Sequence, residues 1–484
     1  MATFNMGEGT YAVPMSLHAE NRRKLVARFG GSTRGMAVVA GGVQLTRNAT
    51  DHEPLFRQES FFHYLFGARE PGFYGAVDLS TGESIMFIPR MDAQWAVWMG
   101  RIEPPETFRV HYEVDAVYFV DEIATVLKAR NLPLFLLRGP NSDSGEEHQP
   151  AHFAGIETFE CDYTRLYWEL CECRVVKTAA ELSLMRHVNA VSSRAHVAVM
   201  QHARAGLKEY QLEATFLHHC YYHGGCRFAS YACICGVGDH AAVLHYGHGG
   251  APNDGPLRDG DMALLDMGAE YHCYASDITC SFPVNGKFTE RQAGIYSIVL
   301  ASMRAVLAAM RPGVSWGDMH GISVRVIAEG LIALGLIKCD LDTALEAGLP
   351  ALFMPHGLGH FMGIDTHDVG GYPPGTSRID RPGFRKLRTT RTLHEGMVLT
   401  VEPGIYFIES VLAPALDDPK TAPLLDRERV QSYYGFGGVR LEDDVIVTAD
   451  GAENMTDVPR DIKDVEEVMA GKQWKFTSKL PTDK

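Results

Sequence analysis

Two aspartates stand where burial would be costly. Asp266 and Asp277 lie on the inner parts of two apolar, β-prone runs, and residues 261–283 therefore predict a β-hairpin or near-hairpin around Gly268-Ala269-Glu270. A buried carboxylate is unfavourable unless it is paired or bound to metal, and two close together repel. A divalent cation between them would remove both penalties, although backbone N–H groups could instead satisfy each aspartate separately.

Three further residues join this pair. Glu402 interrupts an apolar strand predicted for residues 397–406, Glu442 alternates with apolar residues, and His360 lies in a glycine-flanked loop. Oxygen ligands with a single imidazole suit Mn²⁺, Fe²⁺, Co²⁺ or Zn²⁺. Five such side chains are too many for one tetrahedral catalytic site, so they predict two metal ions that share ligands. Such a pair holds a hydroxide between the ions and polarises a carbonyl, so we expect a hydrolase.

The spacing of His356 and His360 also allows a helical zinc motif. Gly357 and Gly359 oppose a helix there, and the acidic residue of a His-Glu-x-x-His site is absent. We therefore reject this interpretation.

The order of these segments resembles the pita-bread metallopeptidases, the family that includes methionine aminopeptidases, aminopeptidase P and prolidase. The resemblance covers about residues 171–460 and, with the additional N-terminal domain, nearly the whole chain. It is greatest to the prolidase (Xaa-Pro dipeptidase) branch. The segments that carry it are Phe56-Arg-Gln-Glu-Ser-Phe-Phe, Asp266-Met-Gly, Ser276-Asp-Ile-Thr-Cys-Ser-Phe, His356-Gly-Leu-Gly-His360, His367-Asp-Val-Gly-Gly-Tyr-Pro, Thr400-Val-Glu-Pro-Gly and Arg440-Leu-Glu-Asp.

The resemblance implies a role for each metal ligand. Asp266 would chelate one metal ion, and Asp277 and Glu442 would bridge both. His360 and Glu402 would complete the coordination of the second ion. Two divalent ions per subunit, most often Mn²⁺, are implied, and Glu402 would also move a proton as general acid and base.

The resemblance also implies substrate contacts. His367 and His245 would contact the scissile peptide group and the proline side, with His367 placed to stabilise the oxyanion. Arg388 would bind the C-terminal carboxylate, although its basic surroundings also suit a solvated loop.

Three more residues are implied in substrate binding, each with a structural alternative. Arg440 would orient the substrate, or would pair with Glu442 or its neighbour Asp443. Tyr231 would line the pocket or pack in the core. Trp98 would reach the active site of a second subunit, whereas with Trp95 and Met99 it could simply be core.

An Xaa-Pro bond is a tertiary amide without an N–H. A protease that must bind the N–H of the scissile bond cannot bind this substrate, whereas metal-assisted attack needs only the carbonyl.

The resemblance implies a dipeptidase that releases C-terminal proline from Xaa-Pro and Xaa-hydroxyproline, as in peptide and collagen-fragment turnover. An aminopeptidase P, which accepts longer peptides, and a catalytically silent binding protein are the alternatives.

The elements that would position these residues are predicted by capping and periodicity. Capping boxes at Thr178 and Thr289 each open a helix, each is followed by a second helix, and strand-like sequence follows both pairs. We expect two related halves with antiparallel sheet inside and helices outside. The fold class is α/β (α+β): a mixed N-terminal α/β domain over residues 1–175, a pita-bread catalytic domain over residues 176–465, and a mobile tail over residues 466–484.

Composition limits the remaining options. The chain has 484 residues and a formal charge of -15, which argues against nucleic acid as a partner. Its ten cysteines lack zinc-type spacing and suit a reducing cytoplasm. We see no secretory signal and no apolar run long enough to span a bilayer. A homodimer is expected from the resemblance alone.

Overall fold

The structure is a computed structural model that describes residues 2–483. The chain divides into two compact units, the first ending at Leu182 and the second beginning at Ser183.

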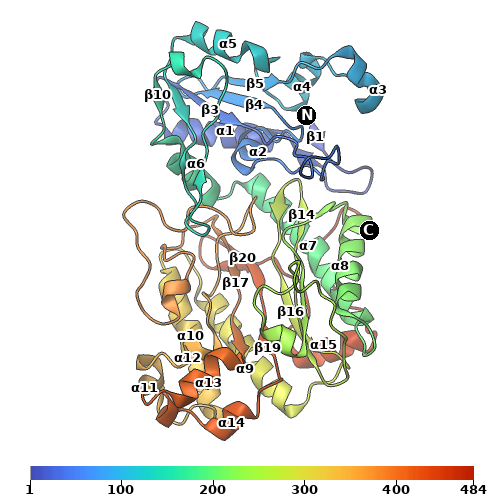
Figure 1. The fold of residues 1–484 in the computed structure, drawn as a ribbon, viewed down its shortest axis with the longest axis vertical. Coiled ribbons are helices and arrows are strands. Elements are labelled where there is room, and N and C mark those ends of the chain that lie inside the picture. The colour runs from blue at the N-terminus through green and yellow to red at the C-terminus, as the bar shows by residue number, and fades with distance from the viewer. Residues whose placement is uncertain (1, 484) are drawn as a thin grey trace. The chain divides into compact units, whose positions relative to one another are not determined.

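The N-terminal unit is built on a six-stranded mixed sheet (Figure 1). The antiparallel centre is the hairpin of β4 and β5 beside β3, and the flanking strands pair in parallel. The strands in spatial order are β10 (Cys161–Asp162), β7 (Leu134–Leu136), β3 (Met36–Ala40), β4 (Tyr74–Asp78), β5 (Ser84–Ile88) and β6 (Ala116–Phe119). The helices are α1 (Ser16–Arg28), α2 (Ser60–Phe66), α3 (Ala96–Met99), α4 (Pro105–His111), α5 (Ile123–Arg130) and α6 (Leu166–Val175). Two short two-stranded sheets complete the unit: β1 (Thr3–Phe4) pairs with β2 (Val13–Pro14), and β8 (Gly139–Pro140) pairs with β9 (Glu147–His148).

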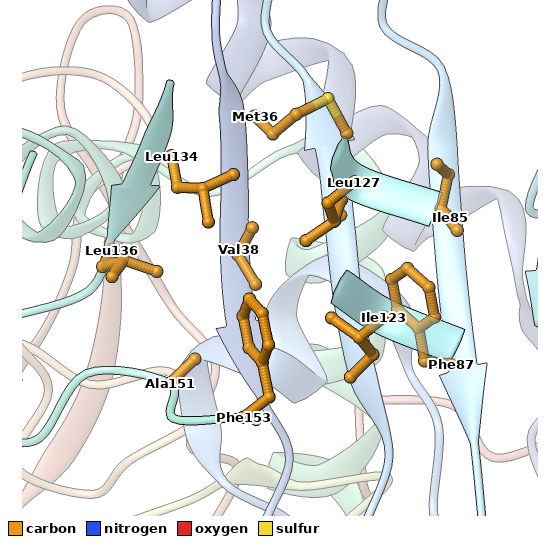
Figure 2. Close-up of a cluster of buried hydrophobic side chains, with 11 residues drawn as sticks. Met36, Val38, Ile85, Phe87, Ile123, Leu127, Leu134, Leu136, Ala151 and Phe153 are labelled. Carbon is orange, nitrogen blue, oxygen red and sulfur yellow. The ribbon is translucent and has the colours of Figure 1, made fainter. Parts of the chain in front are cut away.

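Apolar side chains of the strands and of α5 form a core on one face of this sheet. Figure 2 shows Val38 of β3 and Phe87 of β5 directed at Ile123 and Leu127 of α5. Burying such side chains is the main stabilising contribution in a domain of this size.

One sequence prediction in this unit is wrong in detail. The apolar spacing of residues 117–131 is helical and predicts a helix, but the helix begins only at Ile123, because Ala116–Phe119 form β6 and pair with β5. Residue 175, the end of the predicted N-terminal domain, is also the last residue of α6.

The second unit repeats one order of elements twice, as the capping boxes predict. Helices α7 (Ala179–His202) and α8 (Glu209–Gly224) precede a three-stranded antiparallel sheet, and α9 (Glu290–Ala309) and α10 (Trp316–Ala333) precede another. Both capping boxes form: the backbone N–H of Thr178 donates to Glu181, and that of Thr289 donates to Gln292.

The two sheets of this unit meet where the site residues lie. The first contains β12 (Ile234–Val237), β13 (Met262–Asp266) and β16 (Thr279–Pro283), and the second contains β17 (Val398–Val401), β20 (Asp443–Val447) and β21 (Ala452–Asn454). A β-bridge between Thr279 and Glu442 joins them. Helices α7 and α8 appear on one side of the strands and α10 and α12 on the other (Figure 1). The smaller elements are β11 (Phe228–Ala229), β14 (Ala269–Tyr271), β15 (Tyr274–Ala275), β18 (Gly404–Tyr406), β19 (Gly438–Arg440), α11 (Leu341–Glu346), α12 (Pro350–Phe353), α13 (Glu409–Asp417), α14 (Arg427–Gln431) and α15 (Ile462–Met469).

Two other expectations need correction. The sequence predicts no apolar run long enough to span a bilayer, but α9 is long and apolar enough by length and composition alone. Half of its most apolar window (50%) is buried and the helix packs on α10, as a core helix does. The C-terminal segment expected to be mobile is anchored in part, since Asp457 accepts hydrogen bonds from Trp474 and Thr477 and Arg194 bonds Ser478.

Candidate metal centre and active site

The predicted near-hairpin brings its two aspartates together. Strands β13 and β16 pair antiparallel with Asp266 opposite Thr279, and Asp277 lies just before β16. The Tyr231 hydroxyl lies 2.5 Å from Asp266 Oδ1 and 2.6 Å from Asp277 Oδ1. Because a phenol has one proton to donate, the second contact requires a proton on one of the carboxyls. Tyr231 is therefore part of the site.

The remaining predicted ligands come from the second sheet and its neighbouring loop. Glu402 lies between β17 and β18 instead of inside one strand, and Glu442 directly precedes β20. The loop that carries His360 is fixed against β17, because the Thr400 backbone N–H donates to the His360 carbonyl at 3.0 Å. A Cβ atom at Gly359 would collide with the carbonyl oxygen of Thr400, so this approach requires glycine.

All five predicted ligands converge. Single ligand atoms of Asp277, His360 and Glu442 lie within 4.8 Å of one another, and all three residues are buried. His360 Nε2 lies 3.4 Å from Asp277 Oδ2 and 3.8 Å from Glu402 Oε1. Asp266 connects to this group through the shared Tyr231 hydroxyl.

Burial and mutual repulsion shift the pKa values of these acids. Burial, followed by the charges of Asp277, Glu402 and Asp266, raises the pKa of Glu442 well above its usual range. Burial also raises the pKa of Asp266 to about 7, despite the opposing charge of Arg440.

One acid behaves in the opposite way. Burial is the largest influence on Asp277 and opposes its ionisation, but the hydrogen bond and charge of His360 and the hydrogen bond from Tyr231 together outweigh it and lower the pKa of Asp277. The same contact, with the charge of Glu402, raises the pKa of His360 against the effect of burial. Without metal, this pair is best described as a carboxylate and an imidazolium.

The residues present fit a divalent metal centre. Three buried carboxylates and the partly exposed Glu402 converge on a space where the nearby cationic groups are His360, Arg440 and Arg388, so protons must compensate the excess negative charge. Divalent cations would take over this compensation and would release the protons. Oxygen donors with one imidazole match the donor set that such ions prefer.

Arg440 has a supporting role in this arrangement. Its Nη2 donates to Asp266 Oδ2 at 2.5 Å, its Nη1 to the Tyr406 hydroxyl at 2.9 Å and its Nε to Thr279 at 3.1 Å. Of the two alternatives for Arg440, the geometry favours ion pairing, although the main partner is Asp266; Asp443 pairs instead with Arg460.

Three residues expected to bind substrate share one electrostatic environment. Although His367 is exposed as a residue, desolvation of its ring, then the charges of His360 and Arg388, lowers its pKa to about 3. His245 is also exposed as a residue, and partial desolvation of its ring with the charge of Arg388 lowers its pKa. The His367 ring lies 4.4 Å from that of His360 between centroids. A neutral histidine pair and a guanidinium therefore lie beside the acidic cluster.

Sequence reasoning missed two residues here. His356 Nδ1 lies 3.8 Å from Glu402 Oε2, and its Nε2 lies 2.9 Å from the Tyr406 hydroxyl. His356 and Tyr406 therefore support Glu402 and Arg440. The only sequence signal was the glycine-rich stretch that ends at His360, and this stretch is not helical, as expected.

Glu209 is a third missed residue, and it organises the loop that carries His245. It is fully buried at the start of α8. Its Oε1 accepts hydrogen bonds from the Val237 N–H at 3.0 Å and from His240 at 2.8 Å, and its Oε2 accepts from Tyr246 and the Gly255 N–H, each at 2.8 Å. One carboxylate thus fixes both ends of the segment around His245.

We expect Glu209→Gln to lower kcat/KM about tenfold or more without loss of bound metal. The amide nitrogen cannot accept the Gly255 N–H, so the loop loses one anchor. Steady-state kinetics and metal analysis check this, with the exposed Glu329→Gln on α10 as control. Unchanged kinetics in the Glu209 variant would contradict the positioning role.

The comparisons with known proteins agree with this architecture. The family model for metallopeptidase family M24 matches residues 183–449, and that for the aminopeptidase P N-terminal domain matches residues 18–132. The human Xaa-Pro dipeptidase is 52% identical over 480 residues, which are 98% of this chain and 97% of that protein.

Aminopeptidases of the same family are less similar. A probable Xaa-Pro aminopeptidase of Verticillium alfalfae is 38% identical over 94% of this chain and 96% of its own length. The solved structure of the Pseudomonas aeruginosa aminopeptidase PepP superposes with a TM-score of 0.78 at 31% identity, covering 95% of this chain and 98% of that one. With its paired sheets, converging acids and full-length similarity, this chain belongs to metallopeptidase family M24.

Proposed function

We propose that this metallopeptidase is a dipeptidase that hydrolyses Xaa-Pro and Xaa-hydroxyproline and releases the C-terminal imino acid. The observation that carries the proposal is the complete set of five ligands, four of them buried, beside the Arg388 guanidinium. The 52% identity to the human Xaa-Pro dipeptidase supports the dipeptide specificity over that of the less similar aminopeptidases.

Asp266, Asp277, His360, Glu402 and Glu442 would hold two divalent metal ions. When bound, the ions supply Lewis-acid activation of water and of the scissile carbonyl. We propose Mn²⁺ as the native ion, since the donors are mainly carboxylate oxygens.

The remaining chemistry belongs to side chains of this chain. Burial raises the pKa of Glu402, which suits it to accept a proton at its carboxylate from attacking water and to deliver it to the proline nitrogen. His367 stays neutral because its pKa is about 3, and a neutral imidazole still carries one ring N–H that can donate to the developing oxyanion. His245 would contact the proline side.

Arg388 would determine the length of the substrate. A guanidinium that binds the carboxylate one residue beyond the scissile bond accepts a dipeptide, whereas a longer peptide has a neutral amide there. No N–H of the scissile bond is required, which suits a tertiary amide.

We expect metal-stripped protein to be inactive, and added Mn²⁺ to restore cleavage of Gly-Pro but not of Gly-Pro-Ala. Chromatographic measurement of released proline checks both substrates under the same conditions. Equal cleavage of the tripeptide would make the protein an aminopeptidase P. No cleavage of either peptide by protein with two bound metal ions would indicate a binding protein.

We also propose a homodimer formed through the region around α3. Trp98 is 79% exposed, and Val97 and Met99 are 79% and 69% exposed, so the core-packing alternative is wrong. Adjacent exposed apolar side chains of this kind are typical of interfaces. In the family resemblance, Trp98 reaches the active site of the second subunit.

We expect the Trp98→Ser/Val97→Ser variant to shift the protein towards monomer in light scattering at micromolar concentration. Burial of aromatic residues is a main source of binding energy at interfaces. The control is Tyr222→Ser, which removes an aromatic side chain of 75% exposure on α8. A monomeric parent, or an unchanged dimer in the variant, would contradict the proposed interface.

We propose a cytoplasmic location, because all ten cysteines are free thiols in the structure. In that compartment the substrates would be proline- and hydroxyproline-containing dipeptides from the final stages of protein breakdown, including collagen fragments.

A further inference from the structure

Helix α8 carries three histidines within two turns, outside the centre described above. His218 and His223 are exposed and His219 is half-buried, whereas Phe216 and Cys220 form the buried face. The helix lies at the edge of its unit in Figure 1. None of these histidines contributes to the candidate active site.

Two of the three histidines lie on the same face of the helix, at a spacing that allows both rings to bind one metal ion. Four residues advance about 40° around a helix and about 6 Å along it, so His219 and His223 share one face. Their ring centroids lie 4.6 Å apart. His218 and His223 are five residues apart and diverge by about 140°; their centroids lie 6.4 Å apart, and the His218 ring stacks on Tyr222 instead.

We propose that His219 and His223 form a second metal site, for a late first-row divalent ion such as Ni²⁺, Cu²⁺ or Zn²⁺. Two imidazoles at this helical spacing are the chelating unit of helical zinc motifs, and water would complete the coordination. Imidazole donors favour these ions over Mn²⁺, whereas the carboxylate-rich centre accepts Mn²⁺. The chain would therefore hold two chemically different classes of metal site.

The protonation state of the half-buried ligand suits this role. Burial, with the charges of His223 and His218, lowers the pKa of His219 to about 4. Its imidazole is then neutral at neutral pH, so binding a metal ion requires no proton release from this ring.

The test is calorimetric titration of Ni²⁺ into full-length, tag-free protein kept in excess Mn²⁺. We expect His219→Ala and His223→Ala each to raise the dissociation constant of one Ni²⁺ at least about tenfold, because each removes half of the chelate. His218→Ala is the matched control and should change it less than about twofold. Mass-spectrometric mapping of diethyl pyrocarbonate labelling should show Ni²⁺ protecting His219 and His223 but not His218.

Two results would overturn the proposal: the same affinity in all three variants, or an equal loss in the His218 variant. None of the three histidines is a candidate catalytic residue, and His218 and His223 are exposed, so the Mn²⁺-supported hydrolysis rate should stay unchanged. That rate separates local loss of a ligand from failure to fold.

Discussion

Glu442→Gln is expected to lower the metal-supported hydrolysis rate by at least about a thousandfold, equivalent to about 4 kcal/mol of transition-state stabilisation. The carboxylate proposed to bridge two metal ions becomes an amide that carries no charge. Its hydrogen bond from the Thr279 hydroxyl, at 2.6 Å, is retained by the amide oxygen. The measurement is steady-state hydrolysis of Gly-Pro in excess Mn²⁺, with bound metal determined on the same samples.

The same substitution should stabilise the metal-free protein, or leave its stability unchanged. In that state Glu442 is buried beside Asp277, Glu402 and Asp266, which repel its negative charge. Because its pKa is raised above the ordinary 4.5, the folded chain retains a proton that the unfolded chain has released. The free energy of unfolding of the metal-free parent should therefore fall as pH rises above that value, and less so in the variant. Urea titrations at several pH values measure both effects.

The control for this variant is Glu453→Gln, on β21 of the same sheet. Glu453 is partly exposed and pairs with Arg186 at 2.6 Å, so its loss should cost about 1 kcal/mol at most and leave activity unchanged. Near-parental turnover in Glu442→Gln with full metal occupancy would show that the bridging role is assigned to the wrong residue.

Arg388→Ala is expected to lower kcat/KM for Gly-Pro roughly 100-fold, mainly through KM. Truncating one partner of a hydrogen-bonded charge pair costs about 2 to 5 kcal/mol. The amide of Gly-Pro has no carboxylate to bind, so parent and variant should hydrolyse it equally slowly. Kinetics with both substrates measure directly how much Arg388 contributes to binding the substrate carboxylate.

A second effect follows from the charge of Arg388. Burial and this guanidinium together lower the pKa of His245, and they contribute to the low pKa of His367. Removing the charge should raise both pKa values, so the acidic limb of the kcat/KM profile should move to higher pH. Arg385→Ala is the control, because Arg385 is exposed and pairs with Asp380 at 3.0 Å. If both variants lose dipeptide activity equally, the loop is only a basic surface.

Local sequence was sufficient to predict the scaffold of the second unit. Capping boxes and hydrophobic periodicity predicted α7 to α10 closely, because these signals act over a few residues. They failed at Ala116–Phe119, where the same apolar residues suit a helix or a strand. Pairing with β5, a partner that lies about thirty residues earlier, favours the strand.

The sequence by itself determined the five candidate ligands, since acids in apolar strands are unfavourable unless something compensates their charge. Only the tertiary structure decided how those ligands are held. Arg440 pairs with Asp266, Tyr231 contacts two aspartates, and Glu209 fixes the loop of His245. These partners lie far apart in the chain and come together only when the sheets pair, and a polar side chain gives no local sign of which distant group will satisfy it.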